Sequence, residues 1–328
     1  MNDKLQTAKI TLMKKQIFIT GAAGFIGFHL ALKLQTLGHS VIGFDNFNEY
    51  YSKQLKKERA ALLHKKGIEV VEGDLVNPSS LHEAIKKHRT THLVHLAAQA
   101  GVRYSLINPE AYVSSNLTGF VNILEECRHS SMKCVYASSS AVYGLNQKVP
   151  FSVSDLTDKP ASFYGATKKS NEVMAFSYHH LYGIPVTGLR FFTVYGPWGR
   201  PDMAYYNFSK SILENKPIEV FNHGKMKRDF TYIDDIIDGT IAAIDLEAPC
   251  EIFNLGNNKP VALSTFIEIL EKHLGKKAEK IFLPMQPGDV EVTYADIEHS
   301  RLQLQFNPKT SLDEGLKKFV DWFLNYHK

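Results

Sequence analysis

The chain is poor in cysteine, carries little net charge and contains no long apolar run. Its three cysteines, Cys127, Cys134 and Cys250, are an odd number without C-x-x-C spacing among 328 residues. They indicate neither a disulfide framework nor a zinc site, and they fit a reducing cytoplasm. No stretch reaches the roughly 18 apolar residues that a membrane span needs. The formal net charge is only +4 and no long basic run accompanies it, so we predict neither a nucleic-acid nor a membrane partner.

The remaining composition is that of a folded globular protein. Hydrophobic residues make up 44% of the chain and charged residues 22%, which excludes disorder of the whole chain. At roughly 150 residues per domain, the length corresponds to about two domains. Residues 1–14 are polar and mixed in character, so we predict an N-terminal extension there and not a secretory signal.

Short apolar or β-branched runs alternate with longer segments of helical period. This pattern predicts an α/β fold, with a parallel sheet covered by helices. Predicted helices begin near Gly24, Ser79, Pro109 and Tyr164. The predicted strands cover residues 16–20, 40–44, 69–72, 92–96, 133–137 and 186–191.

The alternation breaks down after about Phe192, where a loop rich in glycine and proline covers residues 196–201. We therefore predict a first domain over residues 15–190 and a second, smaller domain over residues 191–328. Some segments of the second part are expected to return to the first.

Three glycines, Gly21, Gly24 and Gly27, follow the first predicted strand and open the first predicted helix. Such glycines allow a tight turn, close approach of the backbone to a pyrophosphate and close helix–sheet packing, and the helix N-terminus adds amide donors. Asp45 closes the next strand, where a carboxylate accepts hydrogen bonds from both ribose hydroxyls and repels a 2′-phosphate. The pattern predicts a Rossmann-type doubly wound sheet that binds NAD in preference to NADP.

A second pattern, Y-x-x-x-K, is formed by Tyr164 and Lys168. Residues four apart share one face of a helix, so the phenol and the ammonium can point at one spot. We expect the ammonium to lower the pKa of the phenol from its ordinary value near ~10, which makes Tyr164 a predicted general base. Ser139 and its neighbours follow the strand 133–137, at the edge where open sheets bind ligands, so a hydroxyl there can contact a reacting sugar oxygen.

With these motifs in place, the chain resembles a known family. The segments TGAAGFIG, HLAAQAGV, YASSSAVYG, YGATK and LRFFTVYGPWGRPDM occur in this order. They are similar to the extended short-chain dehydrogenase/reductase superfamily, and within it to nucleotide-sugar epimerases, most closely the UDP-glucuronate 4-epimerases. The resemblance implies an NAD-binding domain over residues 15–190, a UDP-sugar-binding domain over residues 191–328, and a homodimer formed through two helices per subunit, here 109–129 and 164–182.

The resemblance also assigns roles residue by residue. Tyr164 matches the family's base, Lys168 its partner, and Ser139 the hydroxyl beside the sugar O4. Predicted nucleotide-sugar contacts are Thr193, Arg228 and Asp289, and Gln286 departs from the arginine of the galactose-type epimerases while it agrees with the glucuronate-type pattern. The predicted cofactor contacts are Gly21, Gly24, Phe25, Ile26, Gly27, Asp45, Asn46, Asp74, Leu75, Ala97, Ala98, Tyr164 and Lys168.

The loop after the fifth strand narrows the implied reaction. Related 4,6-dehydratases and decarboxylating enzymes carry a carboxylate there, whereas this chain has Ser140 and Ala141. The implied reaction is inversion at C4 of a UDP-sugar through a transient 4-ketone, with a hydride taken up and returned by NAD. Arg200, together with Thr193, can recognise a C6 carboxylate; Arg103 is the competing residue, and Ser140 is a further predicted substrate contact. We predict no metal.

Two alternatives stay open. The nearer one is an epimerase acting on UDP-glucose or on an N-acetylated UDP-hexose. The more distant one is a non-catalytic NAD-sensing protein on the same fold, to which the constellation of Ser139, Tyr164 and Lys168 would be of no use.

Overall fold

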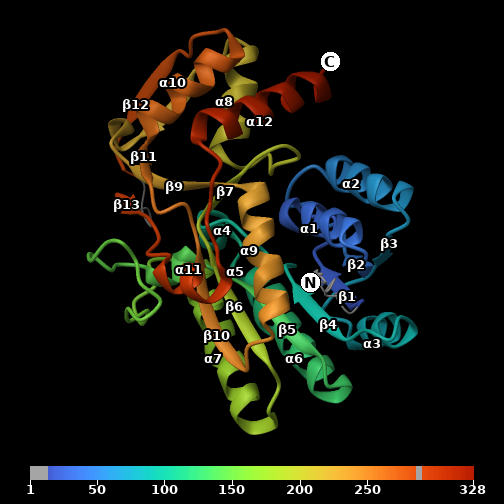
Figure 1. The fold of residues 1–328 in the computed structure, drawn as a ribbon. Coiled ribbons are helices and arrows are strands. Elements are labelled where there is room, and N and C mark those ends of the chain that lie inside the picture. The colour runs from blue at the N-terminus through green and yellow to red at the C-terminus, as the bar shows by residue number, and fades with distance from the viewer. Residues whose placement is uncertain (1–13, 286–289) are drawn as a thin grey trace, which may run out of the picture.

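The computed structural model describes residues 14–285 and 290–328. Its centre is a seven-stranded parallel sheet with the strand order β3-β2-β1-β4-β5-β6-β10 (Figure 1). This order confirms the predicted doubly wound α/β fold. The strands are β1 (Gln16–Thr20), β2 (Ser40–Asp45), β3 (Glu69–Glu72), β4 (His92–His95), β5 (Lys133–Ser139), β6 (Val186–Phe191) and β10 (Cys250–Leu255).

Helices cover both faces of this sheet, as the alternation of strands and helical segments predicts. Successive side chains of a strand point to opposite faces of the sheet. In β1, Ile17 and Ile19 therefore belong to one hydrophobic cluster and Phe18 belongs to the other. The first cluster includes side chains of α1 (Phe25–Thr36), α2 (Lys53–Lys65) and α9 (Ile233–Leu246). The second includes side chains of α3 (Pro78–Lys87), α6 (Gly119–Ser130) and α7 (Phe163–Tyr182).

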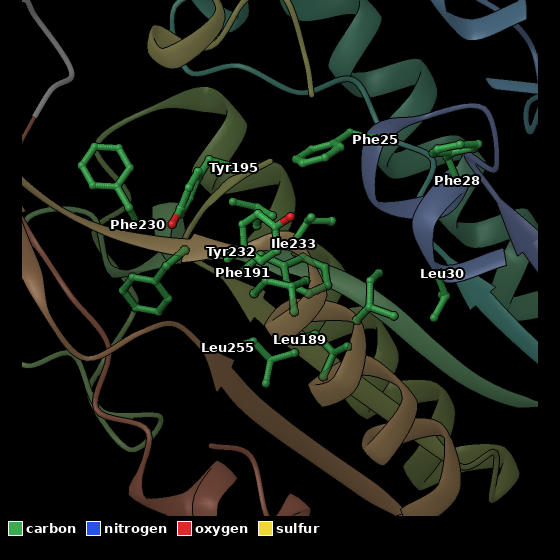
Figure 2. Packing of buried hydrophobic residues seen from close by; sticks show 14 of the residues in the cluster. Phe25, Phe28, Leu30, Leu189, Phe191, Tyr195, Phe230, Tyr232, Ile233 and Leu255 are labelled. Atoms are coloured by element: carbon green, nitrogen blue, oxygen red, sulfur yellow. The ribbon is translucent and has the colours of Figure 1, made fainter. Parts of the chain in front are cut away.

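The larger cluster joins the sheet to the second part of the chain. Figure 2 shows Leu189 of β6, Leu255 of β10 and Ile233 of α9 packed together, with Tyr195 and Phe230 beside them. Each fully buried side chain of this size contributes about 1.5–3 kcal/mol relative to an exposed one. The two parts therefore share one continuous core.

The second part consists of small sheets and further helices, and α8, α10 and α12 gather at one end of the molecule (Figure 1). Two segments of residues 191–328 return to the first part of the chain: β10 pairs with β6, and α9 packs against α1. Its strands are β7 (Thr193–Tyr195), β8 (Ile218–Phe221), β9 (Lys227–Tyr232), β11 (Pro260–Ala262), β12 (Lys280–Leu283) and β13 (Val292–Thr293). Its helices are α8 (Ala204–Leu213), α10 (Leu263–Leu274), α11 (Glu298–Leu304) and α12 (Leu312–Tyr326).

The helix expected from Pro109 is divided into three pieces. After the short helix α4 (Tyr104–Ile107), α5 (Pro109–Tyr112) leads into a π-helical segment, η1 (Val113–Thr118), and only then into α6. A π-helical segment inside an α-helix often marks a functional site, and η1 carries the buried Asn116. Within residues 14–285 and 290–328, no helix is long and apolar enough to cross a membrane. The same residues contain no group of three side chains suited to hold a metal ion.

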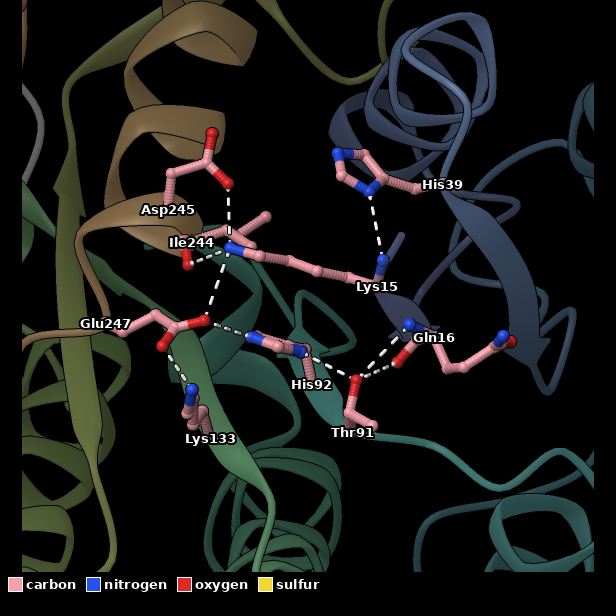
Figure 3. A network of polar contacts seen from close by, with 9 residues as sticks. All are labelled: Lys15, Gln16, His39, Thr91, His92, Lys133, Ile244, Asp245 and Glu247. Carbon is pink, nitrogen blue, oxygen red and sulfur yellow. Dashed lines mark hydrogen bonds and ion pairs between the residues drawn. The ribbon is translucent and has the colours of Figure 1, made fainter. Parts of the chain in front are cut away.

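A polar network binds the amino-terminal ends of the central strands to the end of α9. Glu247, just beyond α9, pairs with Lys133 of β5 and with His92 Nε2 of β4, the latter at 2.9 Å. Lys15 Nζ lies 2.8 Å from Asp245 Oδ1 and 3.4 Å from Glu247 Oε1 (Figure 3). The network lies at the edge of the sheet opposite the carboxyl ends of the strands. We therefore expect it to stabilise the folded protein and not to contact a ligand.

Replacing Glu247 by glutamine tests that role. Burial alone would raise the pKa of Glu247, but hydrogen bonds from Lys133 and His92 lower it to about 2, from an ordinary 4.5. The stabilisation is therefore fully present above pH ~4.5 and lost as the pH falls towards 2. Because the side chain is 32% exposed, we expect a loss of only about 1 kcal/mol at pH 7. Urea unfolding from pH 7 to pH 3 measures it, and Glu298→Gln, which breaks only a surface pair with Arg301, is the control.

Candidate functional site

The carboxyl ends of β1, β4 and β5 meet where the strand order changes direction, between β1 and β4. Open α/β sheets bind ligands at such a point. The loop after β1 holds the three glycines. Gly21 has φ +72°, and a Cβ there would lie 2.6 Å from the backbone nitrogen of Ala97, just beyond β4. Only glycine suits both the backbone conformation and the lack of space.

A cavity extends from this loop along the sheet edge. Its wall also includes Tyr50 and Lys56 of the β2–α2 region and Gln99 after β4, to which the sequence analysis assigned no role. Every residue predicted to contact the cofactor lies in its wall: Gly21, Gly24, Phe25, Ile26, Gly27, Asp45, Asn46, Asp74, Leu75, Ala97, Ala98, Tyr164 and Lys168.

Asp45 is fixed by the glycine loop itself. Its Oδ2 accepts a hydrogen bond from the Ala23 N–H at 3.0 Å, and its Oδ1 accepts one from the Phe47 N–H at 2.9 Å. Burial raises the pKa of Asp45, while these amides and nearby cations act in the opposite direction. The carboxyl group keeps acceptor capacity towards the cavity, so the cradle of glycines and this acid fit the dinucleotide NAD.

Ser139, Tyr164 and Lys168 come together from β5 and α7. Ser162 caps the N-terminus of α7, since its side chain accepts from the Gly165 N–H at 3.1 Å. Lys168 Nζ donates to the Ala137 carbonyl at 2.8 Å, and burial lowers its pKa to about 8. Helix α7 and the carboxyl end of β5 are thus joined at the wall of the cavity.

The electrostatics of Tyr164 differ from the expectation. Burial raises its pKa above the ordinary value, and only a hydrogen bond with Ser139 and the charge of Arg200 act to lower it. The prediction that Lys168 brings this pKa down was wrong for the protein alone. Burial disfavours the charged phenolate of Tyr164. It also disfavours the charged ammonium of Lys168, whose pKa it lowers.

Asn116 holds this constellation in place, and no sequence motif pointed to it. Its side-chain oxygen accepts from the Gln99 N–H at 2.8 Å, and its amide donates to the Gln99 carbonyl at 3.0 Å and to Thr167 Oγ1 at 3.1 Å. Asn171 of α7 donates to the Asn116 carbonyl at 2.6 Å. The π-helical segment therefore connects the loop after β4 to the helix that carries Tyr164.

A second cavity opens on the other side of Ser139 and Tyr164, towards the second part of the chain. Both of these residues, together with Arg200, line the two cavities at once, so a reacting group can contact both bound molecules there. Asp289 lies outside the described residues. The other predicted substrate contacts all line this second cavity: Arg103, Ser139, Ser140, Tyr164, Thr193, Arg200 and Arg228.

The three arginines of this cavity have different surroundings. Arg103 is exposed, and its guanidinium lies 4.8 Å from the ring centre of Phe221. Arg228 donates to the carbonyl of Glu291 at 3.1 Å. Arg200 is 23% exposed and forms a two-point ion pair with Asp202. Burial lowers the pKa of Arg200, but Asp202 outweighs this effect and raises it, so Arg200 is a fixed positive charge.

Known proteins resemble this chain in sequence and in structure. The model of the NAD dependent epimerase/dehydratase family matches residues 17–256. UDP-glucuronate 4-epimerase 1 of Arabidopsis thaliana is 50% identical, over 95% of this chain and 77% of that protein. The structure of UDP-glucuronic acid 4-epimerase from Bacillus cereus in complex with UDP-glucuronic acid and NAD has a TM-score of 0.88 at 37% identity, covering 94% of this chain and 99% of that one.

A neighbour with a different sugar has nearly the same fold. UDP-glucose 4-epimerase from Thermotoga maritima, solved with UDP-glucose, has a TM-score of 0.87 at 29% identity, covering 95% of this chain and 99% of that chain. Overall shape therefore does not distinguish between the two sugars. The family match covers more than half of the sequence and confirms the resemblance inferred from the motifs: this chain belongs to the NAD dependent epimerase/dehydratase family.

Proposed function

We propose that the protein inverts C4 of UDP-glucuronate to give UDP-galacturonate, through a transient 4-keto sugar. The observation that carries this proposal is the meeting of the two cavities. An acid/base pair, Ser139 and Tyr164, and a fixed cation, Arg200, line the same junction. The relatives named for action on UDP-glucuronate and solved with UDP-glucuronic acid and NAD support it.

The chain's own groups divide the work at C4. The wall of the first cavity, with Gly21, Gly24 and Asp45, would hold NAD, which when bound would supply the hydride chemistry at C4. Tyr164 takes the O4 proton in the first half of the cycle and gives it back in the second. Ser139 Oγ accepts from the Ala141 N–H at 3.2 Å, which leaves its own O–H available to donate to Tyr164 or to the sugar O4. Lys168 brings further ammonium donors to the same wall.

The residues around C5 and C6 favour this outcome over related reactions. Ser140 lines the second cavity, and neither it nor Ala141 carries a carboxylate. No acid from that segment is therefore available to remove the C5 proton. Arg200 provides the cation that a C6 carboxylate requires and that a hydroxymethyl group does not.

A substrate panel tests the proposal against the nearest alternative. We expect the purified protein, without added NAD, to convert UDP-glucuronate at least 10-fold faster than UDP-glucose or UDP-N-acetylglucosamine, since a charged hydrogen bond contributes about 1.5–3 kcal/mol. We also expect the nucleotide that denaturation releases from the purified protein to be NAD and not NADP. Faster turnover of a neutral sugar would establish the alternative, and a preference for NADP would contradict the role given to Asp45.

We further propose that the protein is a cytoplasmic homodimer, with the NAD domain formed mainly by residues 15–190 and the sugar domain mainly by residues 191–328. The three cysteines are free thiols, which suits a reducing compartment. Apolar side chains on the outer faces of α6 and α7 are exposed, among them Val121, Val173, Phe176 and Leu181. Exposed apolar surface on adjacent helices is typical of a subunit interface.

A charge placed on this face should separate the subunits. Phe176, which is 61% exposed, would be replaced by glutamate, and light scattering after size-exclusion chromatography would measure the mass. We expect a dimer for the wild type and a shift to monomer for Phe176→Glu. Leu302→Glu, at a residue of α11 that is 69% exposed, should remain dimeric. A dimeric Phe176→Glu variant would place the interface elsewhere.

A further inference from the structure

Asp202 holds Arg200 from one side. Arg200 Nε lies 3.0 Å from Asp202 Oδ1, and one terminal nitrogen lies 2.5 Å from Oδ2. Such a fork fixes both the direction and the plane of a guanidinium. Arg200 has further N–H groups on its other edge, and its side chain lines the junction of the two cavities.

Asp202 is in turn held from the cofactor side of the molecule. The hydroxyl of Tyr50, from the segment between β2 and α2, donates to Asp202 Oδ2 at 3.1 Å. The Tyr50 ring centre lies 4.8 Å from that of Tyr104. A Cβ on Gly101 would approach the Tyr50 hydroxyl to 2.5 Å, so this tyrosine is closely surrounded.

The backbone before the Arg200 side chain is fixed separately. The buried Arg59 of α2 donates to the carbonyl of Trp198 at 2.6 Å and to that of Gly199 at 3.1 Å. The Arg200 N–H donates to the Tyr205 hydroxyl at 3.2 Å. With the backbone held by these contacts, the direction of the guanidinium is left to Asp202.

We infer that Asp202, anchored by Tyr50, is a positioning residue that aims Arg200 at the C6 carboxylate and keeps that carboxylate oriented while the 4-keto sugar exists. The inference rests on the proposed function. It assigns a task to two residues that need not touch the reacting atoms. It also makes the orientation of the sugar's carboxylate depend on a tyrosine from the wall of the cofactor cavity.

The orientation matters because of the chemistry of the intermediate. Oxidation at C4 makes a β-keto acid, which loses CO2 when the C5–C6 bond lies parallel to the carbonyl π system. The bond breaks, its electron pair forms the C4–C5 enolate, and a proton from water gives a UDP-4-keto-pentose, which hydride return converts to a UDP-pentose. A guanidinium held in one plane fixes the carboxylate and slows this loss.

Asp202 has a second, opposing effect on binding. Its negative charge weakens the attraction of Arg200 for an anionic sugar. Removing that charge should therefore leave KM unchanged or lower it, while the loss of aim lowers kcat, since a misplacement of about 1 Å can cost ~100-fold. This combination differs from the loss of a direct contact, which raises KM.

The test compares Asp202→Asn, Tyr50→Phe and the wild type, all as the NAD-loaded enzyme with UDP-glucuronate. For Asp202→Asn we expect kcat to fall by about 10-fold or more, KM not to rise, and the fraction of decarboxylated product to increase. Tyr50→Phe should change the same quantities in the same direction by a smaller factor. Asp321→Asn, which breaks a surface pair with Lys317 at 2.9 Å, should behave as the wild type.

Product partition, measured by mass spectrometry, separates positioning from a merely structural role. A structural defect lowers NAD content and total turnover without changing the ratio of epimerised to decarboxylated product. An unchanged ratio in Asp202→Asn would overturn the inference. If that variant does not fold, an unchanged ratio in Tyr50→Phe overturns it equally. A wild type that does not epimerise UDP-glucuronate would instead remove the proposed function itself.

Discussion

Tyr164→Phe should abolish epimerisation and leave NAD bound. The substitution removes only the hydroxyl that accepts the O4 proton, and a positioned acid/base contributes about 10²–10⁴-fold to the rate. Tyr164 lies at the junction of the two cavities, and its pKa depends on Ser139 and Arg200 as well as on burial. We therefore expect a loss larger than ~100-fold in kcat. Ser139→Ala should cost less, because Tyr164 remains.

A matched control exists on the same helix. Tyr182, near the end of α7, is half exposed and lines neither cavity, so Tyr182→Phe removes an identical hydroxyl away from the site. Turnover of UDP-glucuronate and NAD released by denaturation would be measured for both variants. Near-wild-type activity of Tyr164→Phe would mean that another group is the base.

Arg200→Ala should weaken the binding of UDP-glucuronate and raise the decarboxylated fraction. The loss of a charged hydrogen bond costs about 1.5–3 kcal/mol. Asp202 adds to the effect, because without Arg200 its carboxylate keeps the hydrogen bond from Tyr50 but has lost the cation that balanced its charge, so it repels the substrate. Arg200→Lys keeps the charge but loses the planar fork, so we expect it to recover more of the binding than of the product ratio.

The control for this charge is Arg301, whose guanidinium pairs with Glu298 at 3.1 Å on the surface of α11. Arg301→Ala should leave binding and product partition as in the wild type. Titration calorimetry with UDP-glucuronate and mass spectrometry of the products give the two readouts. If Arg200→Ala changes neither, the carboxylate binds elsewhere, and Arg103, which lines the same cavity, is the next residue to replace.

Six of the seven strands of the central sheet were predicted because their local sequence defines them, whereas β10 was not among the predicted strands. The predicted 16–20, 69–72 and 186–191 agree with β1, β3 and β6, whereas β5 continues to Ser139 through its pairing with Phe191. That continuation depends on a neighbouring strand 52 positions away in the sequence, which a local pattern does not contain. It also places Ser139 on the strand itself rather than on the loop.

The site was predictable as a set of motif residues but not as a network. Glycine spacing and the Tyr164–Lys168 pair indicate chemistry by residue type alone. Asn116 carries no such signal, because its role comes from contacts with Gln99 and Thr167 that folding creates. The direction of the pKa shift at Tyr164 depends on burial, which the spacing of two residues does not reveal.

The anchor of Arg200 shows the same limit. Asp202, two residues away, was visible in the sequence as a neighbouring acid. Tyr50, which fixes Asp202, lies 152 positions from it. Only the fold brings the segment after β2 to the loop after β7. A long-range contact of this kind therefore contributes to the direction of Arg200 in the cavity.

The central claim is that C4 is inverted by removing and returning one hydride. UDP-glucuronate carrying deuterium at C4 tests it most directly, in a nuclear magnetic resonance time course with purified protein and no added NAD. The account predicts that UDP-galacturonate appears with the deuterium retained at C4 and none released into water. Failure to form UDP-galacturonate, or its formation with the C4 deuterium exchanged for solvent hydrogen, would contradict it.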